Sequence, residues 1–169
     1  MISSIRTWMF NKALRGHSNY TVKRNFSGVN LCTSICVIAS GESRSSNAVE
    51  KYKQKLNAQG KLVDVLYYSS DKNVSTLGYS RQHVKWHGIP QHEIVDSILS
   101  KEYDLLIFLY PEMEDHLRYL SILCNAKFKL GPGFHDCTHI FDLMIDVSDR
   151  ENTQLLIQTI DNQLKLLSS

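Results

Sequence analysis

A run of small polar residues offers the groups that can hold an anion. It follows the apolar residues Ile35 to Ala39, which predict a buried strand, and it reads Ser40-Gly41-Glu42-Ser43-Arg44-Ser45-Ser46. Hydroxyl groups, an arginine and the main-chain amides at a helix start can together bind phosphate. The run matches neither the G-x-G-x-x-G pattern nor the P-loop. Two interpretations stay open: an anion site made by Ser40, Gly41, Ser43, Arg44 and Ser45, or a turn that only starts a helix.

Acidic residues gather further along the chain, after a second apolar run. Glu112, Glu114 and Asp115 follow Tyr110 and Pro111. Two neighbouring carboxyl groups can perform acid–base catalysis when burial raises the pKa of one of them. Acidic residues in the first turn of a helix also stabilise that helix through its dipole. We expect the helix-stabilising role here.

Possible metal ligands alternate in one loop, at His135, Cys137 and His139. Imidazole and thiolate groups are typical zinc ligands. The spacing is neither the paired C-x-x-C nor the H-E-x-x-H pattern, so we predict no metal site. Cys137 as a nucleophile would need a nearby histidine in space.

The amino-terminal region combines positive charge with aromatic side chains, and no Asp or Glu precedes Glu42. Such a surface suits an anionic partner: RNA, a membrane face or an acidic protein. The alternative is that the region packs on the sheet with its charges in solvent. Our candidate partner-binding residues are Arg6, Trp8, Lys12, Arg15, Lys23 and Arg24, and the expected partner is a protein or an RNA.

Composition limits the architecture and the compartment. A chain of 169 residues, 43% of them hydrophobic, can bury the core of one domain, and its net charge of +2 does not indicate nucleic-acid binding. We expect a basic arm over residues 1–30 and a single domain over residues 31–169.

Four cysteines without a paired framework favour a reducing compartment. No apolar run approaches the roughly 18 to 20 residues that span a bilayer, and the start lacks a secretory signal. We therefore expect a cytoplasmic protein, although the acid-free basic start also fits an organelle transit peptide.

Hydrophobic periodicity predicts strands alternating with helices. Leu105 to Tyr110 is apolar throughout, as in a strand buried on both faces. The following helix has a stripe at Met113, Leu117, Leu120 and Cys124, and the next strand alternates apolar residues with Lys127 and Lys129, which predicts a charged face near a sheet edge. Further strands are expected over 34–40, 61–70 and 141–147, with a short one over 83–86. Helix starts are expected at Asn47 with Glu50, at Pro90, and at Ser148 with Glu151.

This alternation predicts an α/β fold of three layers. The sheet is open, Rossmann-like and mostly parallel, with about five strands and helices on both faces, and a short basic helix precedes it.

Four segments resemble a known family: VKWHGIP (84–90), YDLLIFL (103–109), AKFKLG (126–131) and FDLMIDV (141–147). Together they resemble an uncharacterised Bacteroidota family that is carried as a domain of unknown function. That family supplies no catalytic or binding residues. The strand–helix–strand pattern is also similar, more distantly, to the amino-terminal half of heptosyltransferase-like glycosyltransferases. Those enzymes hold the sugar nucleotide with a second domain, for which this chain has no room.

The sequence leaves three functional hypotheses. The first is a non-enzymatic binding module whose basic arm contacts an anionic partner, since no catalytic constellation is visible. The alternative is a nucleotide- or phosphosugar-binding protein or enzyme that uses the turn from Ser40 to Ser46. A metal-dependent enzyme built on the histidine and cysteine loop is the third.

Overall fold

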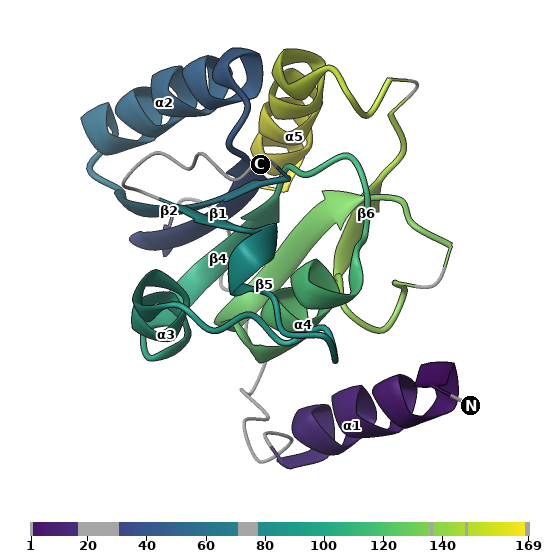
Figure 1. Ribbon diagram of the computed structural model, residues 1–169. Helices are drawn as coiled ribbons and strands as arrows, with labels where there is room; N and C mark the ends of the chain where they lie inside the picture. The colour runs from purple at the N-terminus through teal and green to yellow at the C-terminus, as the bar shows by residue number, and fades with distance from the viewer. Residues whose placement is uncertain (1, 17–30, 71–77, 136, 148, 168–169) are drawn as a thin grey trace.

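A sheet of six parallel strands organises the protein (Figure 1). The computed structural model describes residues 2–16, 31–70, 78–135, 137–147 and 149–167. Within these ranges the strand order is β3-β2-β1-β4-β5-β6. The strands are β1 (Ser34–Ser40), β2 (Leu62–Ser69), β3 (Gly78–Ser80), β4 (Glu102–Phe108), β5 (Asn125–Pro132) and β6 (Leu143–Ile145).

Strands β1 and β4 lie at the centre, because β1 pairs with β2 on one side and with β4 on the other. The apolar run from Leu105 to Leu109 is fully buried. Its side chains alternate between two cores: Leu106 and Phe108 pack on one face, and Leu105 and Ile107 on the other. Burial on both faces explains why the run contains no polar residue.

Helices cover both faces of the sheet, as the sequence predicted. Helices α2 (Ser43–Ala58) and α5 (Thr153–Leu166) cover one face, and α3 (Glu93–Leu99) and α4 (Asp115–Leu123) cover the other (Figure 1). Helix α1 (Ile2–Gly16) lies outside the second layer, where Phe10 packs on Tyr119 of α4 with ring centres 6.1 Å apart. No described helix is long and apolar enough to span a membrane.

The prediction of a strand over residues 83–86 is wrong. These residues lie in a short 3-10 helix, η2 (Arg81–His83), and in an isolated antiparallel bridge between Val84 and Pro90. The neighbouring strand is β3, which begins at Gly78. A Cβ at Gly78 would lie 2.6 Å from the Tyr67 carbonyl oxygen, so the glycine permits this close approach. Strand β3 has only three residues, which are too few to show the alternation of apolar and polar side chains that marks a strand in a sequence.

All three expected helix starts differ from the structure. Helix α3 begins at Glu93, after its cap His92, and not at Pro90. Helix α2 begins at Ser43, four residues before Asn47, and the Glu50 carboxylate accepts a hydrogen bond from Tyr67 Oη at 2.8 Å instead of capping the helix. Asn152 caps α5, since its Oδ1 accepts from the Leu155 amide at 3.1 Å. The predicted cap, Ser148, lies outside the described residues.

The prediction of a fully charged face on β5 is wrong at Lys129. The strand lies near the edge of the sheet as predicted, since only β6 lies beyond it among the described strands, but Lys129 is buried. Its Nζ donates to the carbonyl oxygens of Ser121 and Ile122 at 2.7 and 2.9 Å, near the carboxyl end of α4. Free carbonyl groups there attract a cation, which offsets the burial of the ammonium group.

Asp104 fastens the amino end of β4 to the start of β1. Its Oδ2 accepts from the main-chain amides of Thr33 and Ser34 at 2.8 and 3.1 Å, and its Oδ1 accepts from Lys127 Nζ at 2.7 Å. Burial opposes ionisation, but these hydrogen bonds outweigh it and hold the pKa of Asp104 well below its usual range.

We predict that Asp104→Asn lowers the free energy of unfolding at pH 7 by about 1 to 3 kcal/mol, because the ionised form receives the hydrogen bonds. A carboxyl group with a lowered pKa stabilises the folded state above its unfolded pKa of about 3.9, and this contribution is lost as the pH falls below it. Urea unfolding should therefore show the two proteins converging between pH 5 and pH 2. The exposed Asp146→Asn serves as the control, and equal unfolding free energies for D104N and wild type at pH 7 would disprove the prediction.

Candidate functional site

The carboxyl ends of β1, β2 and β4 meet at one edge of the sheet. From β1 the chain continues through β2 to β3 on one side, whereas β4 to β6 lie on the other side. In open parallel sheets ligands bind in the crevice where the strand order reverses in this way. Ser40 ends β1, Ser69 ends β2, and Tyr110 lies two residues after β4. The crevice between β1 and β4 is therefore the first place to look for a site.

Four rings from four parts of the chain form a cluster at this edge. The Tyr68 ring centre lies 4.2 Å from that of His116, 5.1 Å from that of Tyr79 and 5.5 Å from that of Tyr110. All four side chains are at least nine-tenths buried. We call these residues the carboxyl-edge cluster.

A hydrogen-bonded chain runs through the carboxyl-edge cluster to the surface. His116 Nε2 lies 3.2 Å from a carboxylate oxygen of Glu114, and Tyr79 Oη lies 2.9 Å from His116 Nδ1. The carboxylate can only accept, so Nε2 carries the proton and Nδ1 accepts from the tyrosine. Tyr79 and His116 are buried, while the Glu114 side chain is 41% exposed. Two buried groups thus hold one accessible carboxylate in place.

Burial determines the protonation states in the cluster. It lowers the pKa of His116, and the nearby Glu114 charge offsets this only in part, so the imidazole is neutral at pH 7. Burial also raises the pKa of Tyr68, Tyr79 and Tyr110, and the Glu114 carboxylate adds to each shift. The tyrosines therefore stay protonated and can donate hydrogen bonds.

Two hydroxyl groups of the cluster have no partner within the described part of the chain. Neither Tyr68 Oη nor Tyr110 Oη makes a hydrogen bond there. Both oxygen atoms keep some contact with solvent. A hydroxyl that is nearly buried but unpaired is available to a ligand.

The turn from Ser40 to Ser46 uses several of its polar groups internally. The Gly41 amide donates to the Tyr68 carbonyl oxygen at 2.7 Å, and Ser40 Oγ accepts from the Glu42 amide at 3.3 Å. Ser45 Oγ accepts from Thr153 Oγ1 of α5 at 3.0 Å. The side chains of Ser43 and Arg44 lie outside the described part of the structure.

The main-chain amides of the first turn of α2 remain the most suitable anion donors in this turn. The first amides of a helix have no partner within the helix, and the side chain of the N-cap residue, Glu42, makes no capping hydrogen bond to them. The helix dipole adds partial positive charge at the same place.

Charge is divided across the edge. The carboxylates of Glu42, Glu112 and Glu114 lie close enough to Tyr110 to raise its pKa. Arg81 lies close enough to Tyr68 for its positive charge to lower the pKa of that tyrosine, which offsets part of the rise caused by burial. The carboxylates of Glu112 and Glu114 therefore favour hydroxyl or cationic groups beside Tyr110, whereas at the start of α2 the helix dipole favours an anion and the Glu42 carboxylate opposes it.

The candidate residues of the amino-terminal region are described only in part. Trp8 is 61% exposed, and Lys12 Nζ lies 5.0 Å from the centre of its ring. The side chains of Arg6 and Arg15, and all of Lys23 and Arg24, lie outside the described residues.

The loop from His135 to His139 does not gather its three candidate ligands. Cys137 is fully buried in the core, whereas His135 and His139 are exposed. Among the described residues there is no group of three His, Cys, Asp or Glu side chains placed to hold a metal ion. The histidine and cysteine spacing therefore carries no argument for a metal-dependent enzyme.

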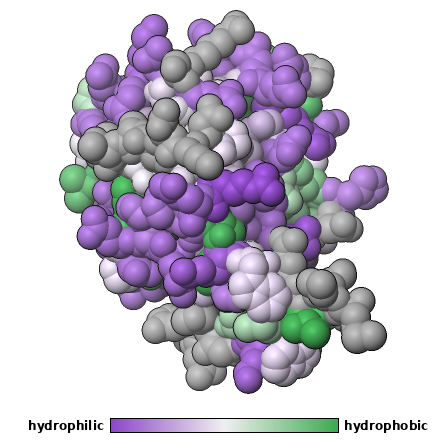
Figure 2. All heavy atoms as spheres, viewed as in Figure 1, coloured by the Kyte–Doolittle hydropathy of each residue, from purple (hydrophilic) through white to green (hydrophobic). Residues whose placement is uncertain are grey.

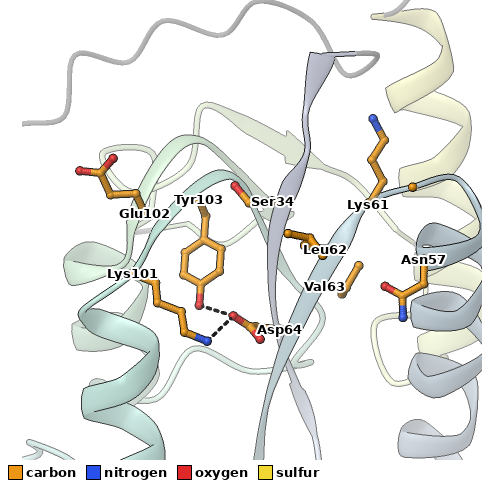
Figure 3. A pocket seen from close by; sticks show the side chains of 10 residues that line it. Ser34, Asn57, Lys61, Leu62, Val63, Asp64, Lys101, Glu102 and Tyr103 are labelled. Carbon is orange, nitrogen blue, oxygen red and sulfur yellow. Dashed lines mark hydrogen bonds and ion pairs between the residues drawn. The ribbon is translucent and has the colours of Figure 1, made fainter.

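A pocket of about 870 Å³ opens at the opposite, amino-terminal edge of the sheet (Figure 3). Three of its polar side chains are already paired with one another: Asp64 accepts from Lys101 Nζ at 2.8 Å and from Tyr103 Oη at 2.9 Å. Burial opposes ionisation of Asp64, but these two donors outweigh it and lower its pKa. This pairing makes the amino edge a weaker candidate than the carboxyl edge.

Sequence reasoning pointed to the same end of the strands but missed the carboxyl-edge cluster. It weighed Glu114 as one of a pair of catalytic carboxyl groups or as a residue that stabilises a helix, and it did not consider Tyr79 or His116. These two residues lie 37 positions apart in the chain, and no local spacing signals their hydrogen bond.

Comparison with known proteins identifies one family that the chain matches. A family model described as "Family of unknown function (DUF6913)" matches residues 4–167. No curated protein and no solved structure matches the chain.

We predict that His116 makes stability depend on pH. In the unfolded chain it protonates near pH 6.5, and in the folded protein at a lower pH. Between these values the unfolded chain binds more protons, so the free energy of unfolding falls as the pH drops from 7 to 5. His116→Asn should flatten this profile and also cost about 1 to 3 kcal/mol at pH 7 through the lost buried hydrogen bonds.

Chemical unfolding at half-unit pH steps measures both effects. His139→Asn, at an exposed position, should keep the wild-type profile. His83 contributes a residual slope of the same sign, since burial and His92 lower its pKa. A wild-type slope in H116N would contradict the hydrogen-bonding scheme.

Proposed function

Since the chain belongs to the DUF6913 family, a family of unknown function, we propose its function from its geometry. The protein binds a small phosphorylated ligand rich in hydroxyl groups, of the nucleotide or phosphosugar class, at the carboxyl edge of the sheet. One observation carries the proposal: buried His116 and Tyr79 hold the half-exposed Glu114 carboxylate beside the hydroxyls of Tyr68 and Tyr110, which make no hydrogen bond to the described residues.

The phosphate group fits the start of α2. The amides of Ser43, Arg44 and Ser45 form its first turn, and the helix dipole favours an anion there. Ser40 and Gly41 shape the turn through their own hydrogen bonds. The five residues chosen from the sequence thus remain the proposed anion site, with main-chain amides as the principal donors.

The hydroxyl groups of the ligand fit the other side of the edge. Carboxylates accept hydrogen bonds from ribose or sugar hydroxyls, as an acidic residue does in dinucleotide-binding folds. Glu114 is oriented for this role, and the tyrosine hydroxyls can donate or accept beside it. We assign binding to this site and no reaction.

We also propose a cytoplasmic location and a Bacteroidota origin. The location is supported by four free cysteines, all of them buried. The origin is supported by the four sequence segments that resemble that family.

Calorimetric titration and thermal-shift measurements with nucleotides, sugar phosphates and their unphosphorylated counterparts test the ligand. We expect binding that requires the phosphate, and a dissociation constant raised about 2- to 12-fold by Tyr110→Phe or Tyr68→Phe, the equivalent of one neutral hydrogen bond. Glu114→Gln should weaken binding by about tenfold or more, since its hydrogen bonds are charge-assisted.

Tyr52→Phe is the matched control for the hydroxyl deletions. Tyr52 belongs to α2 and its side chain is buried on the other face of the sheet, so removal of its hydroxyl should leave binding unchanged. A flat thermal response to every phosphorylated compound would remove the proposal.

A second function is favoured by a separate observation: α1 presents an exposed tryptophan with a lysine over its ring. We propose that the protein is a binding module in which α1 contacts an anionic partner. Arg6, Arg15, Lys23 and Arg24 belong to this proposal through their charge in the sequence. No acidic residue precedes Glu42 to oppose such a contact.

Retention on a heparin column tests this second function. Lys12→Glu should elute at lower salt than wild type, because a charge is reversed on the contacting helix. Lys51→Glu makes the same change on α2 and should shift elution less. Equal shifts in the two variants would show that only net charge matters and would contradict a role for α1.

A further inference from the structure

The outward face of α1 carries two large apolar side chains that the fold does not cover. Trp8 is 61% exposed and Ile5 is 51% exposed, one helical turn apart. Figure 2 shows apolar and intermediate atoms gathered at the α1 end of the molecule, whereas the sheet domain above is mostly hydrophilic. Exposed large apolar groups beside cationic groups mark an interaction surface.

Helix geometry explains why these residues point outward. Phe10 is buried against Tyr119, and Ala13 and Leu14 pack partly against the same core. At about 100° per residue, Trp8 and Lys12 each lie roughly 160° around the helix from Phe10. One face of α1 therefore docks on α4, and the opposite face, with Ile5, Trp8 and Lys12, stays in solvent.

We infer that this outward face docks on an anionic lipid surface, with Trp8 and Ile5 entering the interface and Lys12 contacting the headgroups. The inference rests on the proposed binding role of α1 and names its partner. At 15 residues the helix is too short to span a bilayer, which needs about 20. It can lie flat in the interface, where tryptophan is favoured and cations attract anionic lipids.

Two details favour lipid over RNA. Ile5 is aliphatic and offers nothing to a base or a phosphate, but it can enter the acyl boundary. Lys12 Nζ lies over one face of the Trp8 ring, which leaves only the other face for stacking with a nucleotide base. A lysine beside the ring does not hinder insertion into an interface, since its charge can reach the headgroups.

Cosedimentation of the full chain with vesicles tests the inference. Wild type should bind vesicles that contain phosphatidylglycerol, bind pure phosphatidylcholine vesicles much less, and dissociate in about 0.5 M salt. Trp8→Ala and Ile5→Ser should each reduce binding by about tenfold, as expected when a large apolar side chain is no longer buried. Leu62→Ala is the matched control, because Leu62 is an exposed apolar residue on β2.

Tryptophan fluorescence provides a direct readout. The chain has two tryptophans, so Trp86→Phe leaves Trp8 as the single emitter. Its emission should shift to shorter wavelength with anionic vesicles and stay constant with neutral ones. Circular dichroism melts of all variants confirm that the fold is intact, since Phe10, the docking residue, is unchanged.

Each outcome decides the inference. Failure of wild type to bind anionic vesicles overturns it, as does equal binding by Trp8→Ala. If vesicles fail but oligouridylate or polyglutamate binds, and Trp8→Ala or Lys12→Glu weakens that binding, the lipid inference fails while the α1 binding role stands. If none of these partners binds, both are overturned.

Discussion

Burial of the two central strands on both faces is the constraint on which the structure depends. Strands β1 and β4 lie between two layers of helices, so their side chains must be apolar along most of their length. Unpaired polar groups there would cost several kcal/mol each. Polar chemistry is therefore confined to the two ends of the strands and to the outer helices.

The two ends of the sheet use their polar groups differently. At the amino end, Asp104 and Asp64 are paired with main-chain amides, lysines and a tyrosine, and these contacts join strands. At the carboxyl end, a buried histidine and tyrosine hold one carboxylate at the surface, and the hydroxyls of Tyr68 and Tyr110 have no partner in the part of the chain that the structure describes. Groups that are satisfied internally stabilise the fold, whereas oriented but unpaired groups can receive a ligand.

Helix α1 differs from the other helices in how little of its apolar surface it buries. Helices α2 to α5 each bury a stripe against the sheet. By contrast, α1 packs on α4 mainly through Phe10 and keeps Trp8 and Ile5 in solvent. Large apolar groups in solvent do not stabilise the isolated protein. Their exposure on α1 is explained if a partner covers them.

The sequence by itself determined the architecture, because periodicity is a local property. The apolar run of Leu105 to Leu109 and the stripe of Leu117, Leu120 and Cys124 require a buried strand and a helix that packs on it. Tertiary structure alone decided which polar groups meet. Lys129 reads as exposed in the sequence but is buried because α4 ends above it, and His116 joins Tyr79 to Glu114 because β3 lies beside β2. Hydrogen bonds between residues far apart in the chain depend on strand order, which hydrophobic patterning does not specify.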